Sequence, residues 1–235
     1  MLTPRSELVL RLIVEDYIRS AEPVGSRFLV EEHQIGVSSA TIRNEMVQLE
    51  QEGYIRQPHT SAGRIPTEKG YQYYLRHILA AETPPTSRPL LQTDVVREQE
   101  IEETLKSLAH SLVRLSGETA FVAFDPRFSY YAGVSNLFHK PDFHDLEMIR
   151  SLSTLIDSFD EIVAQMTNRS LDQPTVYIGT EGPFGEHVSA IVLRCHFPNN
   201  QTGMLGLIGP LRMNYVHNLA LMKRASELLD EMYET

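Results

Sequence analysis

Residues 38–66 read SSATIRNEMVQLEQEGYIRQPHTSAGRIP, and this stretch decides the fold of the first part of the chain. Ser38 or Ser39 can cap a helix, and Gly53 suits the residue just past its C-terminal end. The apolar residues of this helix recur at helical spacing and form a stripe that can be buried: Ile42, Met46 and Leu49. The pattern predicts an amphipathic helix that ends before Gly53.

Two further helices are expected upstream. Thr3 can cap the first, and Ser26 can cap a short second one. The second helix would direct three apolar residues toward the core, Phe28, Leu29 and Val30. Gly36 then marks a tight turn before the helix that follows Ser38. A short helix, a tight turn and a longer helix together predict a helix-turn-helix.

A β-hairpin is expected directly after the third helix. Residues 54–57 and 64–66 have the composition of two short strands, and they flank the small polar loop 59–63. A hairpin in this place is typical of a wing. We therefore expect residues 1–80 to form a winged helix-turn-helix domain.

The expected helix-turn-helix carries side chains that suit duplex DNA. In this motif the second helix lies in the major groove and contacts base edges from its exposed face. Arg43 can donate two hydrogen bonds to guanine and Asn44 can pair with adenine, each contributing about 1–3 kcal/mol of discrimination. Most surface arginines and asparagines only face solvent, so that alternative stays open. The exposed face would present Ser39, Ala40, Arg43, Asn44 and Val47.

The hairpin suits the DNA backbone, because small residues, hydroxyl groups and the Arg64 charge can approach phosphates there. Within residues 54–76 only Glu68 opposes four cations, which are Arg56, Arg64, Lys69 and Arg76. A solvated hairpin without this role is the alternative. The residues expected to contact double-stranded DNA are Ser26, Arg27, Ser38, Ser39, Ala40, Thr41, Arg43, Asn44, Arg56, His59, Thr60, Ser61, Gly63 and Arg64.

Length and composition favour two soluble globular domains. The chain has 235 residues, of which 42% are hydrophobic and 22% charged. Its net charge of −10 lies mostly downstream, because residues 1–80 hold nine basic and ten acidic side chains. No apolar run is long enough for a membrane helix, and the single cysteine can form no internal disulfide. We expect a cytoplasmic protein that does not bind membranes.

A second domain is expected beyond a proline-rich linker at residues 81–93. It would occupy residues 94–235 and have an α+β fold. Its strand patterns lie at 119–124, 175–179, 188–197 and 204–208, and its main helical patterns at 147–165 and 213–233.

A heptad-like stripe begins this second domain, consisting of Ile101, Leu105, Leu108, Leu112 and Leu115. The stripe can pack against the chain's own sheet, or it can pair with the same helix of a second copy. The second interpretation predicts a homodimer, whose two-fold symmetry a palindromic operator requires. Both interpretations remain open, and dimerisation is the one we adopt as the prediction.

Three strings in the first domain resemble the heat-inducible transcription repressor family HrcA: PVGSR at 23–27, SATIRNEM at 39–46 and QPHTSAGRIPT at 57–67. In the second domain, residues 131–137 and 206–215 also resemble this family, whose second domain is similar to a GAF sensor fold. The resemblance implies repression of chaperone operons through an inverted-repeat operator called CIRCE. It also implies that the GroE chaperonin maintains the activity.

One feature departs from that family. Its members usually carry an inserted dimerising domain within the GAF-like part, whereas residues 125–128 here run directly into Ser129. A short form without the insert would have to dimerise through the leucine stripe or through the GAF-like surface.

Two other clusters carry possible chemistry, and each has a simpler explanation. The first resembles a metal site, although loop polarity and helix capping account for it better: His139, Asp142, His144 and Asp145. The second, Cys195 with His196, resembles a nucleophile and its base, but adjacent strand residues point to opposite faces. We expect no metal, no cofactor and no enzymatic activity.

Two other functions remain open. The GAF-like domain could sense a small molecule, which would make the chain a ligand-controlled regulator of other genes. The winged helix could instead serve protein contacts, within an enzyme or a chaperone-binding module that does not bind DNA. Ligand-dependent melting would favour the first alternative, and a lack of sequence-preferring duplex binding would favour the second.

Overall fold

The computed structural model describes residues 2–60, 62–79, 101–124, 128–143, 146–166, 171, 173–197 and 201–233. The chain is a mixed α/β protein that divides into two compact units, Met1–Thr83 and Pro84–Thr235. Within the described residues, no helix is both long and apolar enough to cross a membrane.

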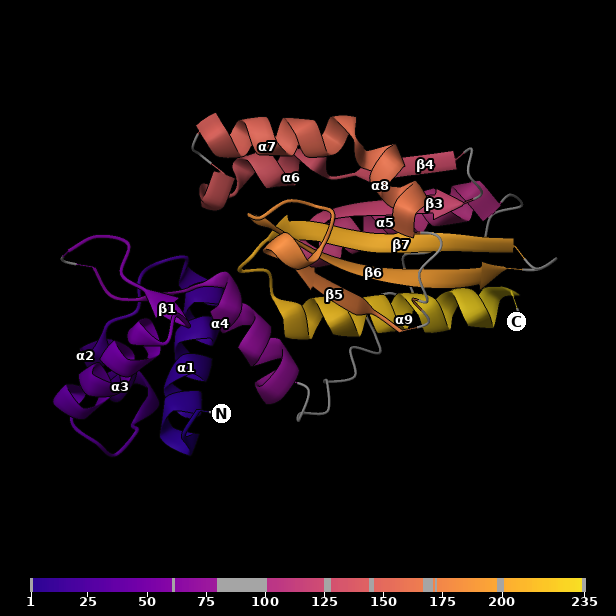
Figure 1. Ribbon diagram of the computed structural model, residues 1–235. Coiled ribbons are helices and arrows are strands. Elements are labelled where there is room, and N and C mark those ends of the chain that lie inside the picture. Colours follow the sequence, from indigo (N-terminus) through magenta and orange to yellow (C-terminus); the bar gives the residue numbers. More distant parts are fainter. Residues whose placement is uncertain are drawn as a thin grey trace. The chain divides into compact units, whose positions relative to one another are not determined.

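Three helices build most of the first unit (Figure 1): α1 (Pro4–Ser20), α2 (Ser26–His33) and α3 (Ser39–Gln51). The side chain of Thr3 caps α1 by accepting a hydrogen bond from the Ser6 backbone. Ser38 caps α3 in the same way through the backbone N–H of Thr41. The core between the helices is apolar and includes Leu10, Ile13, Leu29, Ile42 and Leu49.

A small antiparallel hairpin follows α3. Its strands are β1 (Ile55–Arg56) and β2 (Ile65–Pro66). Val24, which precedes α2, forms one isolated antiparallel bridge with Arg64. Gly53 ends α3 with a positive φ of 79°, and the Tyr54 backbone N–H returns to the Leu49 carbonyl. The last described elements of the unit are α4 (Glu68–Tyr73) and the π-helical turn η1 (Tyr74–Ile78).

The start of α2 differs from the sequence prediction. Its N-cap is Gly25, which has no side chain to make a capping hydrogen bond, and Ser26 is the first residue inside the helix and is buried. Phe28 is exposed rather than buried, because Leu29 occupies the inward position of this short helix.

The second unit is built on a five-stranded antiparallel sheet with the strand order β4-β3-β7-β6-β5. The strands are β3 (Thr119–Phe124), β4 (Phe128–Ala132), β5 (Thr175–Ile178), β6 (Val188–Phe197) and β7 (Gln201–Pro210). The two longest strands, β6 and β7, pair along their whole length from Val188↔Pro210 to Phe197↔Gln201.

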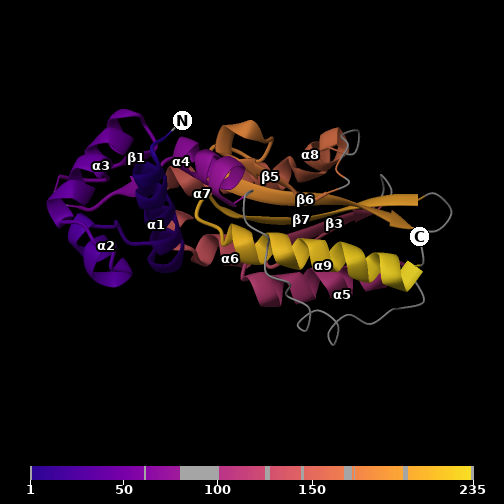
Figure 2. The same ribbon diagram turned by 90° about the horizontal axis from the view of Figure 1, so that it is seen from below.

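Helices cover both faces of this sheet. One face carries α5 (Ile101–Ser116) and α9 (Tyr215–Tyr233), which lie side by side in Figure 2. The other face carries α6 (Val134–His139), α7 (Leu146–Asp157) and α8 (Phe159–Met166), together with the short turns η3 (Pro141–Phe143) and η4 (Gly179–Glu181). The apolar core on this second face includes Phe121, Phe143, Leu152, Phe159 and Ile208.

The leucine stripe of α5 packs inside its own chain. Leu105, Leu108 and Leu112 are buried, because α5 lies against β3, β4 and α9. This packing corresponds to the first of the two interpretations that the sequence allowed. Ile101 and Leu115, at the two ends of the stripe, are half-buried. The three buried leucines thus favour packing against the chain's own sheet, while dimerisation through the stripe Ile101, Leu105, Leu108, Leu112 and Leu115 stays a prediction.

A substitution in this stripe distinguishes core from interface. We expect Leu108→Ala to lower the free energy of unfolding by about 2–5 kcal/mol, because Leu108 is 0% exposed and its loss leaves a cavity. Urea denaturation followed by circular dichroism measures the change, and the half-buried Leu115 should tolerate alanine better. Unchanged stability combined with loss of a dimer would instead make the stripe a subunit interface.

Candidate DNA interface

The outward face of α3 presents a continuous set of exposed side chains. Arg43 and Asn44 lie at its centre and are both exposed, as are Ser39, Ala40 and Val47. The opposite side of the same helix supplies Ile42, Met46 and Leu49 to the core. The helix is amphipathic in the sense the sequence predicted, with its polar side directed to solvent.

A buried carboxylate fixes the inward face of α3. The Ser6 hydroxyl donates to Oε2 of Glu45 over 2.8 Å, and Arg5 Nε donates to Oε1 over 2.7 Å. The hydrogen bond from Ser6, assisted by Arg5, lowers the pKa of Glu45 even though burial acts to raise it. Glu45 thus ties α3 to the start of α1. This contact was not predicted from the sequence, although an acidic residue within the apolar stripe of a helix, as Glu45 is, indicates a buried partner.

A second buried carboxylate was also missed. Asp16 of α1 is buried and bonds to His33 Nε2 of α2 over 2.7 Å, while Arg19 donates to its other oxygen. This contact ties α1 to the end of α2, just before the turn that leads into α3. Each of the two helices before α3 is therefore held by a hydrogen-bonded acid.

The cations of the interface differ in how they are engaged. Within the described part of the chain, Arg43 and Arg56 make no ion pair or side-chain hydrogen bond. Arg27 is exposed but pairs with Glu31 over 2.7 Å. Lys69 donates to the Glu52 carbonyl at the end of α3 over 2.7 Å. Arg43 and Arg56 are consequently the cations best placed to receive a phosphate or a base edge.

Glu50 of α3 anchors the hairpin to the helix. Its Oε2 accepts a hydrogen bond from Nε of Arg64 over 3.0 Å and forms an ion pair with Nη2 at 2.9 Å. Its Oε1 accepts a hydrogen bond from the backbone N–H of Gln57 over 3.1 Å. The Arg64 side chain is only 18% exposed. In the free protein, Arg64 holds the base of the hairpin to α3, in addition to any contact it makes with phosphate.

The hairpin loop has its own internal support. The side-chain amide of Gln57 donates to the carbonyls of Thr60 and Ala62 over 3.1 and 3.0 Å. His59 and Thr60 are exposed at the tip. Ser61, which was also predicted to contact DNA, lies outside the described residues. A Cβ on Gly63 would lie 2.4 Å from the Val24 carbonyl oxygen, so this glycine is required by the close approach of two backbones.

The second unit offers little at the clusters that the sequence singled out. Asp142 accepts two hydrogen bonds from Arg212 Nε at 2.9 and 2.8 Å, and His144 and Asp145 lie outside the described residues. Among the residues that the structure describes, no three His, Cys, Asp or Glu side chains are grouped to hold a metal. Burial raises the pKa of the Cys195 thiol to about 12, which makes it a poor nucleophile.

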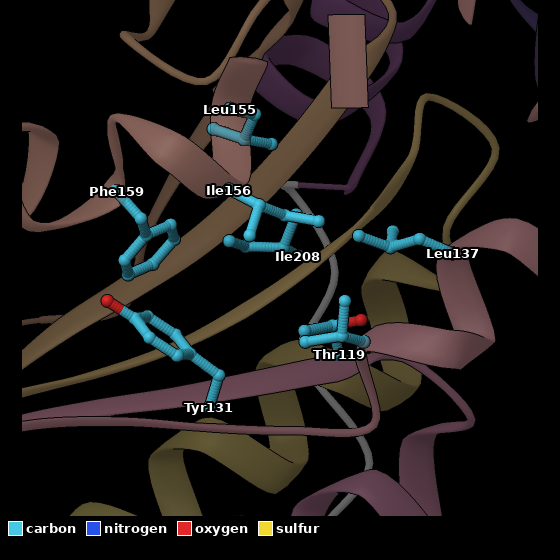
Figure 3. A pocket seen from close by; sticks show the side chains of 8 residues that line it. Thr119, Tyr131, Leu137, Leu155, Ile156, Phe159 and Ile208 are labelled. Atoms are coloured by element: carbon cyan, nitrogen blue, oxygen red, sulfur yellow. The ribbon is translucent and has the colours of Figure 1, made fainter. Parts of the chain in front are cut away.

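A small apolar cavity lies between the sheet and the helices α6 to α8 (Figure 3). Its volume is about 20 Å³, the space of roughly one water molecule. Sites for small-molecule ligands usually measure about 300–1,000 Å³. The lining residues are Thr119, Tyr131, Val134, Leu137, Leu155, Ile156, Phe159 and Ile208. The cavity is therefore too small to hold a small-molecule ligand of the usual size.

Comparison with protein-family models shows one match that covers most of the chain. The model of the HrcA protein C-terminal domain matches residues 64–218. The chain belongs to the HrcA family. The match begins at Arg64 in the hairpin and continues into α9, so it includes the sheet and its helices.

Relatives of known name agree with this assignment. The heat-inducible transcription repressor HrcA of Halalkalibacterium halodurans is 29% identical over 342 residues, covering 100% of this chain and 99% of the relative. HrcA of Bifidobacterium adolescentis is 49% identical over 125 residues, which span 52% of this chain but only 33% of that relative. Both are named as transcription repressors, as the sequence predicted, and not as enzymes.

The alignment with the H. halodurans HrcA shows that this relative is longer than the chain, as expected if the chain lacks the inserted domain. Since this chain has 235 residues, at least 107 of the 342 aligned positions hold residues of the relative alone. A crystal structure of a hypothetical protein, solved at 2.2 Å, shares the fold with a TM-score of 0.83 at 21% identity, over 99% of both chains.

The Glu45 contact predicts a specific pH dependence. Because the folded-state pKa of Glu45 is lowered, its stabilisation is present above the unfolded value of 4.5 and is lost as the pH falls through the folded value. We expect the wild-type chain to exceed Glu45→Gln in unfolding free energy at pH 7, and this difference to shrink toward pH 3. Urea titrations at both pH values measure it. A difference that stays constant with pH would contradict an ionised Glu45 anchor.

The tight approach at Gly63 predicts a strained variant. We expect Gly63→Ala to destabilise the first unit by about 1–3 kcal/mol, because the new Cβ overlaps the Val24 carbonyl. Gly25→Ala is the comparison variant, since a Cβ there meets nothing within 4 Å and only the loss of a glycine N-cap is expected, which costs less than about 1 kcal/mol. Thermal unfolding of the two variants compares them. Equal melting temperatures would show that the two backbones are not in close contact.

Proposed function

We propose that this chain is a repressor of heat-shock genes that binds double-stranded operator DNA through a winged helix-turn-helix. In this proposal α3 lies in the major groove and the hairpin β1–β2 forms the wing that contacts the backbone. The second unit is a GAF-like domain that sets the spacing of the two DNA-binding units in a homodimer. The names of the HrcA relatives support the assignment to heat-shock control.

One observation carries the proposal. The exposed face of α3 centres on Arg43 and Asn44, and Arg43 has no internal partner among the described residues. An arginine that pairs with no acid of its own chain keeps its full hydrogen-bonding capacity for guanine. The adjacent hairpin adds the exposed Arg56, His59 and Thr60 within the same short segment of chain.

The operator is proposed to be an inverted repeat of the CIRCE type. A homodimer then places one α3 in each half-site, with centres about 34–36 Å apart or a multiple of this distance. Since Leu105, Leu108 and Leu112 are buried, the dimer contact is proposed to use the GAF-like surface, with the stripe contributing at most its half-buried ends Ile101 and Leu115. Dependence on the GroE chaperonin remains part of the proposal through family membership.

Genome-wide footprinting with the purified chain tests this function. Enrichment of inverted repeats upstream of chaperone operons is the expected result. Enrichment at other genes would keep the DNA-binding mechanism and contradict the heat-shock assignment. A complete lack of sequence-preferring binding would contradict both. Adding purified GroE to the binding reaction tests the chaperonin part, with stronger operator occupancy as the expected result.

Two arginine variants separate base recognition from backbone contact. We expect Arg43→Ala to lose about 1–3 kcal/mol of discrimination and to relax preference at one base pair in each half-site. Arg56→Ala should weaken binding about equally for all sequences. It should also reduce the slope of log affinity against log salt concentration by about one, because one phosphate contact is lost. Gel-shift titrations with preferred and scrambled duplexes at several salt concentrations measure both. Unchanged affinity and preference in Arg43→Ala would reject the role of α3.

A further inference from the structure

A partly exposed apolar side chain lies on the proposed DNA-binding face, toward the C-terminal end of α3. Val47 of α3 is 41% exposed, while Ile42, Met46 and Leu49 of the same helix are buried. It follows Arg43 by four residues and therefore lies one helical turn further along the same side. Val47 consequently belongs to the outward face and not to the core.

Helix propensity does not favour a valine at this position, because a β-branched residue is a poorer helix former than alanine, lysine or glutamate. With 41% of its surface exposed, Val47 also gains only part of the stabilisation that full burial would give. The neighbouring exposed positions of α3 hold polar or very small residues, Ser39, Ala40, Arg43, Asn44 and Gln48. A bulky apolar group among them suits an apolar feature on the ligand.

We propose that Val47 reads the C5 methyl group of a thymine in each half-site of the operator. This methyl group is the apolar feature that base pairs present in the major groove, and apolar side chains recognise it by contact. The proposal rests on the DNA-binding function proposed above and adds a specificity-determining residue to it. It assigns the outward face of α3 two kinds of contact, hydrogen bonds from Arg43 and Asn44 and a methyl contact from Val47.

Helix geometry limits where that thymine lies. Four residues of an α-helix advance about 6 Å along its axis. Successive bases of one strand are about 3.4 Å apart along the duplex. The thymine is therefore expected within about two base pairs of the pair that Arg43 contacts.

A uracil scan tests this assignment. The full-length chain first selects its preferred sequence from a library of random duplexes. Each thymine of the selected duplex is then replaced in turn by deoxyuridine, which removes only the C5 methyl group. Affinities are measured by fluorescence anisotropy at one salt concentration, for the wild-type chain and for Val47→Ala.

For the wild-type chain, we expect one thymine in each half-site at which uracil weakens binding about fourfold, the effect of one buried methyl group. Val47→Ala should bind the unmodified duplex more weakly and show no further loss at that position. Leu8→Ala is the matched control, because Leu8 is also 41% exposed but lies on α1. It should keep the wild-type scan. Because the better helix propensity of alanine offsets the lost partial packing of Val47, Val47→Ala should melt close to the wild-type chain.

Two results would overturn the inference alone. A flat uracil scan for the wild-type chain would show that no thymine methyl group is read. An identical scan for Val47→Ala would assign the methyl contact to another residue. A selection that yields no preferred sequence would contradict the proposed DNA-binding function itself, and with it this inference.

Discussion

The rotation of α3 about its own axis decides which side chains the first unit can offer to DNA. Burial of Ile42, Met46 and Leu49 sets that rotation approximately. The carboxylate of Glu45 fixes it, because its two oxygens accept hydrogen bonds from Arg5 and Ser6 at the start of α1. A buried charge is costly unless it is satisfied, so other rotations of the helix are strongly disfavoured.

The hairpin inherits its position from the same helix. Glu50 binds both Arg64 and the backbone of Gln57, so the two strands are fixed to the last turn of α3. The absence of a side chain at Gly63 then lets the hairpin pair closely with Val24. Helix and hairpin therefore form one preorganised surface, which reduces the entropy that ordering would otherwise cost on binding DNA. Arg64 serves this preorganisation, a role that its sequence context alone did not indicate.

Local chemistry was predictable from the sequence, whereas tertiary pairing was not. The caps at Thr3 and Ser38 and the helix end at Gly53 depend on adjacent residues and were predicted. The strand β4 was missed because four of its five residues are half-buried, so it shows no alternation of apolar and polar positions. The predicted helix 147–165 is in fact two helices, α7 and α8. They were predicted as one because both bury apolar residues in the same core, and the helical spacing of these residues continues across Ser158. The contacts that join elements, Ser6 with Glu45, His33 with Asp16 and Glu50 with Arg64, connect residues 39, 17 and 14 positions apart, and no local pattern indicates them.

The most direct test of the account is to locate α3 on bound DNA. The single native cysteine is buried, so an iron chelate can be attached selectively to Gln48→Cys on the exposed side of α3. With the selected duplex, the account predicts strand cleavage at two major-groove positions, separated by about one helical turn or a multiple of it. Cleavage no different from that by chelate-treated protein without the introduced cysteine would contradict the claim that α3 binds in the groove.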